Sequence, residues 1–158
     1  MTKKTPQRDP KTGRYLSKGK KSLSGTPSPQ DPIADAQRYL DNAREILSTK
    51  AGKKEGYYSD RKYVRMAGNT AWNGVLVALD AVLDVPENLK KNQRPDVNTY
   101  RLPLGQKNRK MLKVFDSAYD TLHKAMGYDG NLKVKIVAEG MGDAKKLLQW
   151  CKDNYRPK

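Results

Sequence analysis

The sequence predicts an all-α protein, an antiparallel bundle of about four helices that follows a disordered basic N-terminal arm. Three observations lead to this fold class. Apolar residues repeat with helical spacing in several stretches after residue 31, no segment alternates convincingly as a strand, and the first 30 residues lack any apolar period. Amphipathic helices with short connections pack as antiparallel neighbours. We therefore divide the chain into an arm, residues 1–30, and a helical bundle domain, residues 31–158.

The arm is strongly cationic and has too few apolar groups to form a core. It contains eight lysines or arginines and one aspartate, a balance of +7. Four prolines and three glycines interrupt any regular element. Because so little apolar surface cannot offset the entropy lost on ordering, we expect the free arm to be disordered.

Two helices are predicted in the first half of the bundle. The first begins at Asp31-Pro32, since Asp is a favoured cap and Pro a favoured first residue, and ends near residue 51. Its buried stripe is Ile33, Ala36, Leu40, Ala43 and Leu47. The second, capped by Ser59 or Asp60 and stopped by Pro86, has the widest apolar face and should be the most buried: Val64, Ala67, Ala71, Trp72, Val75, Leu76, Leu79, Val82 and Leu83.

The second half begins with an irregular connection. Residues 86–106 contain Pro95, Pro103 and Gly105, so we expect a loop with at most one short helical turn. A third helix follows, with the stripe Leu112, Phe115, Tyr119, Leu122 and Met126, and the turn GYDGN ends it. The last helix has the stripe Val134, Val137, Met141, Ala144, Leu148 and Cys151; glycines at 140 and 142 mark a kink or a close helix contact.

Composition limits the chemistry that the chain can perform. Cys151 and His123 are the single cysteine and histidine, which excludes an internal disulfide and a structural zinc site. The carboxylate pairs Asp80/Asp84 and Asp116/Asp120 lack the Glu-x-x-His motif of dimetal bundles. No glycine-rich phosphate loop is present. We predict no cofactor and no metal.

The start of the chain does not resemble a signal peptide, and no apolar run approaches the roughly 18 residues that span a bilayer. We therefore expect a cytoplasmic location and no membrane partner.

His123 is the weak candidate for catalysis. Asp120 precedes it by three residues, so the two could meet on one helical face as an acid–base pair. A solvated histidine near the end of its helix is the simpler interpretation. An enzymatic site, a small RNA-cleaving or nucleotide site that would add Tyr119 and Tyr128, is the least favoured hypothesis, and we lean toward a non-enzymatic protein.

The net charge of +15 favours association with polyanions such as nucleic acid. Flexible cations neutralise phosphates without base specificity, and cations interleaved with tyrosines can bind single strands. Tyr57, Tyr58 and Tyr63 lie among such cations, but the simpler interpretation is that Tyr63 packs in the core while Tyr57 and Tyr58 cover its rim. The predicted contacts with DNA or RNA are Lys3, Lys4, Arg8, Lys11, Arg14, Lys18, Lys20, Lys21, Lys53, Lys54, Arg61, Lys62 and Arg65. The alternative is a protein-interaction module, which could be a homodimer, with the charge serving solubility.

Several stretches also carry a family resemblance. DAQRYLDNAREILSTKA, YYSDRKYVRMAGNTAWNGVLVALDAVL and SAYDTLHKAMGYDGNLKVKIVAEGMGDAKKLLQWC together resemble an uncharacterised bacterial domain-of-unknown-function family, over roughly residues 31–154. The resemblance implies a helical bundle similar to HEPN domains. HEPN nucleases use an Arg-x4-6-His motif, and no arginine lies four to six residues before His123. The resemblance therefore implies a catalytically silent bundle that binds nucleic acid or a protein.

Overall fold

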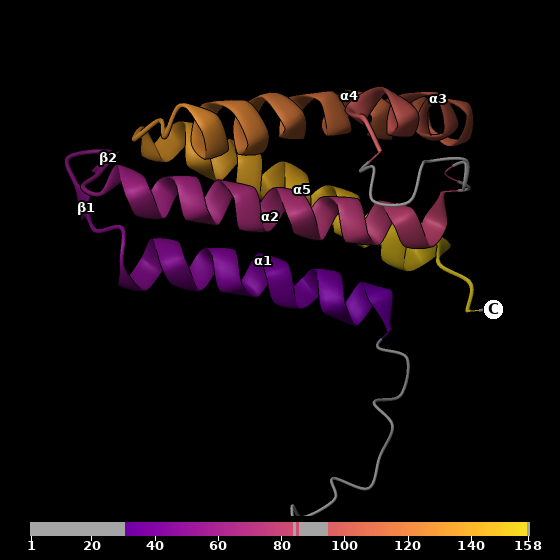
Figure 1. Ribbon diagram of the computed structural model, residues 1–158, viewed down its shortest axis with the longest axis horizontal. Coiled ribbons are helices and arrows are strands. Elements are labelled where there is room, and N and C mark those ends of the chain that lie inside the picture. Colours follow the sequence, from indigo (N-terminus) through magenta and orange to yellow (C-terminus); the bar gives the residue numbers. More distant parts are fainter. Residues whose placement is uncertain (1–30, 84, 86–94, 158) are drawn as a thin grey trace, which may run out of the picture.

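The computed structural model describes residues 31–83, 85 and 95–157, and within them it confirms the all-α bundle (Figure 1). The predicted arm, residues 1–30, lies outside the described residues. The elements in chain order are α1 (Pro32–Thr49), β1 (Lys53–Lys54), β2 (Tyr57–Tyr58), α2 (Arg61–Val82), α3 (Val97–Lys107), α4 (Arg109–Ala118), the π-helix η1 (Tyr119–Tyr128) and α5 (Val134–Asn154).

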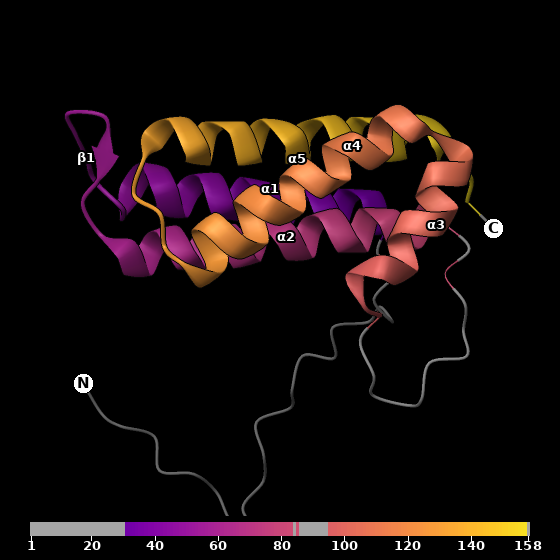
Figure 2. The same cartoon turned by 90° about the horizontal axis from the view of Figure 1, so that it is seen from above.

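Helix α2 is the centre of the bundle. It packs against α1 on one side and against η1 and α5 on the other (Figure 1). The continuous rod of α4 and η1 crosses obliquely over this layer, so that α4 packs on α5 and η1 packs on α2 (Figure 2). The most enclosed helix is thus the one with the widest apolar face, as the sequence predicts.

The starts of α1 and α2 follow from side-chain caps. The Asp31 carboxylate accepts a hydrogen bond from the Ile33 N–H at 3.0 Å, and the Asp60 carboxylate accepts one from the Lys62 N–H at 2.9 Å. Each cap satisfies a backbone donor that the first helical turn leaves unpaired. The predicted stripe of α1, from Ile33 to Leu47, is buried along its whole length.

A short hairpin, with two residues in each strand, joins α1 to α2. Its strands are antiparallel, with Lys53 opposite Tyr58, and its turn places Glu55 and Gly56 at positive φ. The Tyr58 N–H donates to the Leu132 carbonyl at 2.7 Å, and the Val134 N–H donates to the Gly56 carbonyl at 3.0 Å. The hairpin is therefore tied to the segment that enters α5.

The connection before α4 differs from its prediction. Residues 86–94 lie outside the described residues, but residues 97–107 form α3 rather than a loop with one short turn, even though Pro103 lies inside the helix. Tyr100 and Leu104 are fully buried against the bundle. Tertiary burial of these two side chains stabilises a helix that local propensity disfavours.

The predicted third helix changes its winding at Tyr119, where α4 continues as the ten-residue η1. η1 approaches α2 very closely at Gly68. A methyl group at that position would lie 2.5 Å from the Met126 Cβ and 2.7 Å from the Leu122 carbonyl oxygen. Gly140 of α5 is close to Thr121 and Leu122 in the same way, which confirms the predicted close contact at that glycine.

Gly68→Ala should destabilise the bundle by about 1–3 kcal/mol, because the new methyl group must push η1 away from α2. Gly142→Ala is the matched control, since a Cβ there meets no atom within 4 Å and α5 is otherwise regular. That control should raise stability by about 0.5–1 kcal/mol through helix propensity. Urea unfolding followed by circular dichroism measures both, and equal effects of the two substitutions would contradict the close contact.

Candidate functional site

A cleft of about 620 Å³ runs beside α2, between that helix and the chain that forms α3 and η1. Its residues come from α1, α2, the start of α3 and η1. Most are aromatic or polar: Tyr39, Asn69, Trp72, Asn73, Asp80, Asp96, Tyr100, Tyr119 and His123. A volume of this size is within the range of about 300–1,000 Å³ that small-molecule sites have.

Three rings pack together at one side of the cleft. Tyr119 and His123 of η1 are stacked, with ring centres 5.3 Å apart and planes 22° apart. The Trp72 ring of α2 lies 5.6 Å from Tyr119 and 5.9 Å from His123, and it also contacts Phe115 in the core. Trp72 therefore joins the cleft to the hydrophobic core.

The cleft also holds a partly desolvated carboxylate. The buried Tyr100 hydroxyl donates to the Asp80 carboxylate at 2.7 Å. Burial raises the pKa of Asp80, and the hydrogen bond from Tyr100 partly opposes this rise. The pKa of Tyr100 is also raised, first by burial and then by its bond to Asp80, so the phenol stays protonated and remains the donor. Among the described residues, no lysine or arginine forms an ion pair with Asp80.

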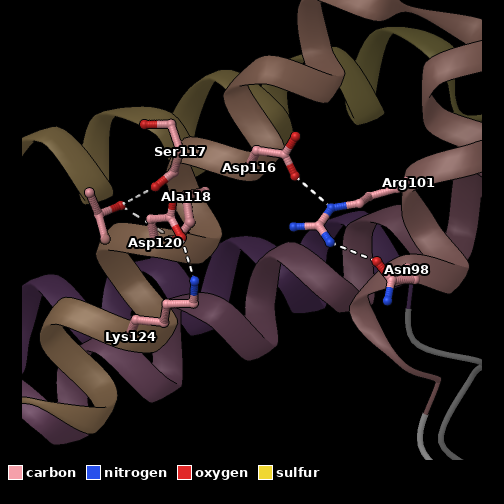
Figure 3. Close-up of polar contacts among 8 residues, drawn as sticks. Asn98, Arg101, Asp116, Ser117, Ala118, Asp120 and Lys124 are labelled. Carbon is pink, nitrogen blue, oxygen red and sulfur yellow. Dashed lines mark hydrogen bonds and ion pairs between the residues drawn. The ribbon is translucent and has the colours of Figure 1, made fainter.

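Asp120 and His123, the weak catalytic candidates, are not joined by a hydrogen bond in the structure. The Asp120 carboxylate pairs with Lys124 at 2.9 Å (Figure 3). The reason is the winding of η1, where hydrogen bonds run from i to i+5 and residues three apart no longer share a face as in an α-helix. Tyr119 does contact His123, as described above, whereas Tyr128 is 80% exposed at the other end of η1.

The Tyr119 ring is flanked by two cations, each with its own acid. The Arg101 guanidinium lies 5.6 Å and the Lys124 ammonium 4.8 Å from the ring centre. Arg101 reaches Asp116 at 2.7 Å, and it also donates to the Asn98 side chain at 2.7 Å (Figure 3). The hydrogen bond to Asp116 raises the pKa of Arg101, which remains fully charged. Asp116 and Asp120 thus each form an ion pair with a different cation, and they do not act together as one carboxylate site.

A second feature is a cluster of cations at the hairpin end of the bundle, which we call the basic end. It comprises Lys50, Lys53, Lys54, Arg61, Lys62, Arg65 and Lys133, brought together by the end of α1, the hairpin, the start of α2 and the entry to α5. The acids at this end are Glu55, Asp60 and Asp129. The ion pairs within the described part of the chain all lie elsewhere, so none of these seven cations is paired there.

The tyrosines at the basic end have different roles. Tyr58 is buried and Tyr63 is half-buried, with Lys53 and Lys62 over their rings at 5.5 Å and 4.4 Å. Tyr57, by contrast, is 52% exposed, and the exposed Tyr128 lies at the same end of the bundle. The hairpin and the start of α2 gather the five cations that were predicted in the bundle: Lys53, Lys54, Arg61, Lys62 and Arg65. The eight predicted arm cations, Lys3 to Lys21, lie outside the described residues.

The other titratable groups that the structure describes form no further site. Cys151 is fully buried, and burial raises its pKa to about 12, so the thiol stays protonated as predicted for a packing group. Within residues 31–83, 85 and 95–157, no cluster of three or more His, Cys, Asp or Glu side chains could hold a metal ion. Asp84, half of one predicted carboxylate pair, lies outside these residues. None of the helices described has both the length and the apolar character needed to cross a bilayer.

The sequence contained a signal for the cleft that our prediction did not use. Asn69, Asn73 and Asp80 are spaced by four and seven residues, so they share one face of α2. This is the solvent-facing side of α2, where Asn69 and Asp80 are exposed, and the cleft lies along it. Its partners Tyr100 and His123 come from distant parts of the chain, so spacing alone could not connect them.

The fold and these two features define a basic all-α bundle domain with a polar aromatic cleft. A family described as a domain of unknown function (DUF5618) matches residues 31–153. The chain belongs to this family, which confirms the resemblance to an uncharacterised domain family. A solved structure described as a protein of unknown function from Dyadobacter fermentans is similar, with a TM-score of 0.70 and 39% identity, over 80% of this chain and 98% of that one. Among curated proteins, none matches.

The raised pKa of Asp80 predicts a pH-dependent cost of folding. The folded state holds this proton more tightly than the unfolded state, so the contribution of Asp80 is most favourable below its ordinary pKa of about 4 and is lost as the pH rises through the raised value. Asp80→Asn removes the titration while its side-chain oxygen can still accept from Tyr100. Its stability relative to wild type should therefore increase from acid to neutral pH.

Urea midpoints measured at several pH values between 4 and 7 test this expectation. Tyr100→Phe is the companion variant: it removes the donor that lowers the pKa of Asp80, so the pH-dependent loss should become larger. A wild-type profile that runs parallel to the Asp80→Asn profile at every pH would contradict the desolvation of Asp80.

Proposed function

We propose that this protein is a non-enzymatic basic helical module that associates with nucleic acid without sequence specificity. The observation that carries the proposal is the basic end, where seven cations from four segments of the chain lie together and, among the described residues, none is paired with a carboxylate. Cations that form no ion pair with a carboxylate are available to phosphates, whose condensed counterions they release on binding.

The exposed tyrosines add a reason to favour single strands over duplex. Tyr57 and Tyr128 present large rings to solvent at the basic end. Bases of a single strand can stack on such rings, and each stack contributes about 1–3 kcal/mol. The cationic arm predicted from the sequence would supply further phosphate contacts. The same proposal includes two further points: the bundle is related to HEPN domains, and the protein is located in the cytoplasm.

The alternative, a protein-interaction module, has less support. The large exposed apolar side chains of the described residues are Tyr57, Met66, Leu102 and Tyr128. Leu102 is on α3, away from the basic end where the two tyrosines lie. Stable interfaces usually have a contiguous apolar centre, and Leu102 does not form one with the two tyrosines. Light scattering tests the alternative, because a homodimer has twice the mass of the monomer.

Binding of a fluorescent single-stranded oligonucleotide across a salt series tests the basic end. The triple variant Lys53→Gln, Lys54→Gln, Lys62→Gln should bind more weakly. The slope of log K against log salt should also decrease in magnitude by about 2, because each contact with a single-stranded phosphate contributes roughly 0.7 to that slope. The matched control Lys107→Gln, Lys110→Gln, Lys113→Gln removes the same charge from exposed positions of α3 and α4. Equal losses in both variants would show that net charge alone acts, and would reject the basic end as the site.

The contribution of the arm is tested separately. Replacing all eight cations of residues 1–30 with glutamine, in the full chain, should lower the affinity and the salt slope further. This result is expected because flexible cations contact phosphates wherever the strand passes. Unchanged affinity and slope would limit the proposed contacts to the bundle.

A further inference from the structure

The sign of the charge in the cleft is opposite to that of the protein. The chain carries +15, yet the charged side chains that line the cleft include two carboxylates, Asp80 and Asp96, and no lysine or arginine among the described residues. Arg101 and Lys124, whose charged groups lie near the Tyr119 ring, are compensated by Asp116 and Asp120. The two carboxylates in the described lining of the cleft would repel a phosphate, which the basic end suits better.

Asp80 has unused capacity to bind a cation. A carboxylate has about four acceptor positions. The hydrogen bond from the Tyr100 hydroxyl, at 2.7 Å, uses one of them. Because Asp80 forms no ion pair with a cation among the described residues, an incoming positive group would stabilise its ionised form.

The walls of the cleft are suited to an organic cation rather than to a metal ion. The rings of Trp72, Tyr119 and His123 pack against one another at this side of the cleft, where Trp72 is nearly buried and Tyr119 and His123 are more accessible. Aromatic faces attract ammonium and guanidinium groups, and Tyr119 already does so, with Lys124 at 4.8 Å. The amides of Asn69 and Asn73 line the same helix face and can accept hydrogen bonds from N–H donors.

We propose that the cleft binds a small organic ammonium ion, with Asp80 as its counter-ion and the rings of Trp72, Tyr119 and His123 around its apolar part. The site is separate from the basic end, because its charge has the opposite sign and its residues come from the middle and far end of α2.

Fluorescence of Trp72 provides the measurement. In a Trp150→Phe background, Trp72 is the one remaining tryptophan of the chain, and it lines the cleft. Choline and putrescine serve as probes of a quaternary and a primary ammonium, with sodium chloride holding the ionic strength constant. The uncharged carbon isostere of choline, dimethylbutanol, is the control ligand. At least one amine should give a saturable change, and the isostere should bind at least tenfold more weakly.

Variants then assign the site. Asp80→Asn should weaken amine binding at least tenfold, whereas Asp153→Asn, which removes the same charge from an exposed position of α5, should leave it unchanged. Absence of saturation by both amines, equal binding of the isostere, or unchanged affinity in Asp80→Asn would each overturn the proposal.

The two proposals fail independently. The triple variant at Lys53, Lys54 and Lys62 should retain amine binding, and Asp80→Asn should retain nucleic-acid binding. If one substitution abolished both activities while the protein stayed folded, the cleft and the basic end would be a single site and the present assignment would be wrong.

Discussion

The close approach of α2 and η1 at Gly68 is the constraint on which the rest of the structure depends. A side chain at that position would meet the Met126 Cβ and the Leu122 carbonyl oxygen, so only glycine lets the two helices touch there. The crossing fixes where η1 begins and ends relative to α2. At one end of η1 it brings Tyr119 and His123 against Trp72, and at the other it brings Gly130 against Arg61 and Arg65. One backbone contact therefore organises both the cleft and the basic end.

Helices with a regular apolar stripe and a capping residue could be predicted from the sequence, because both signals are local. Asp31 and Asp60 begin α1 and α2 as expected, and the stripe of α1 is buried throughout. α3 could not be predicted, since Pro103 disfavours a helix locally and the stabilising burial of Tyr100 and Leu104 comes from packing on distant segments. The π-helix was equally hidden, because its apolar residues also fit an α-helical stripe.

The candidate sites divide in the same way. The cations of the basic end are close in sequence, apart from the segment near Lys133, so charge counting found five of them. Which tyrosine there is exposed depends on the hairpin and its bonds to Leu132 and Val134, and no local pattern encodes that choice. The cleft combines residues from four separated segments, and only the polar face of α2 that includes Asn69 and Asp80 marks it in the sequence.

An acidic cleft in a protein of net charge +15 raises the question of whether the overall field would repel a cationic ligand. Screening answers it, since interactions between exposed charges decay over about 8 Å at physiological salt. Asp80 and Asp96 line the cleft directly, while the cations of the basic end lie around the first turns of α2. Arg101 and Lys124 are nearer but are held by their own carboxylates. Local contacts therefore determine the sign that a ligand meets in the cleft, and the long-range field determines only how polyanions approach the molecule.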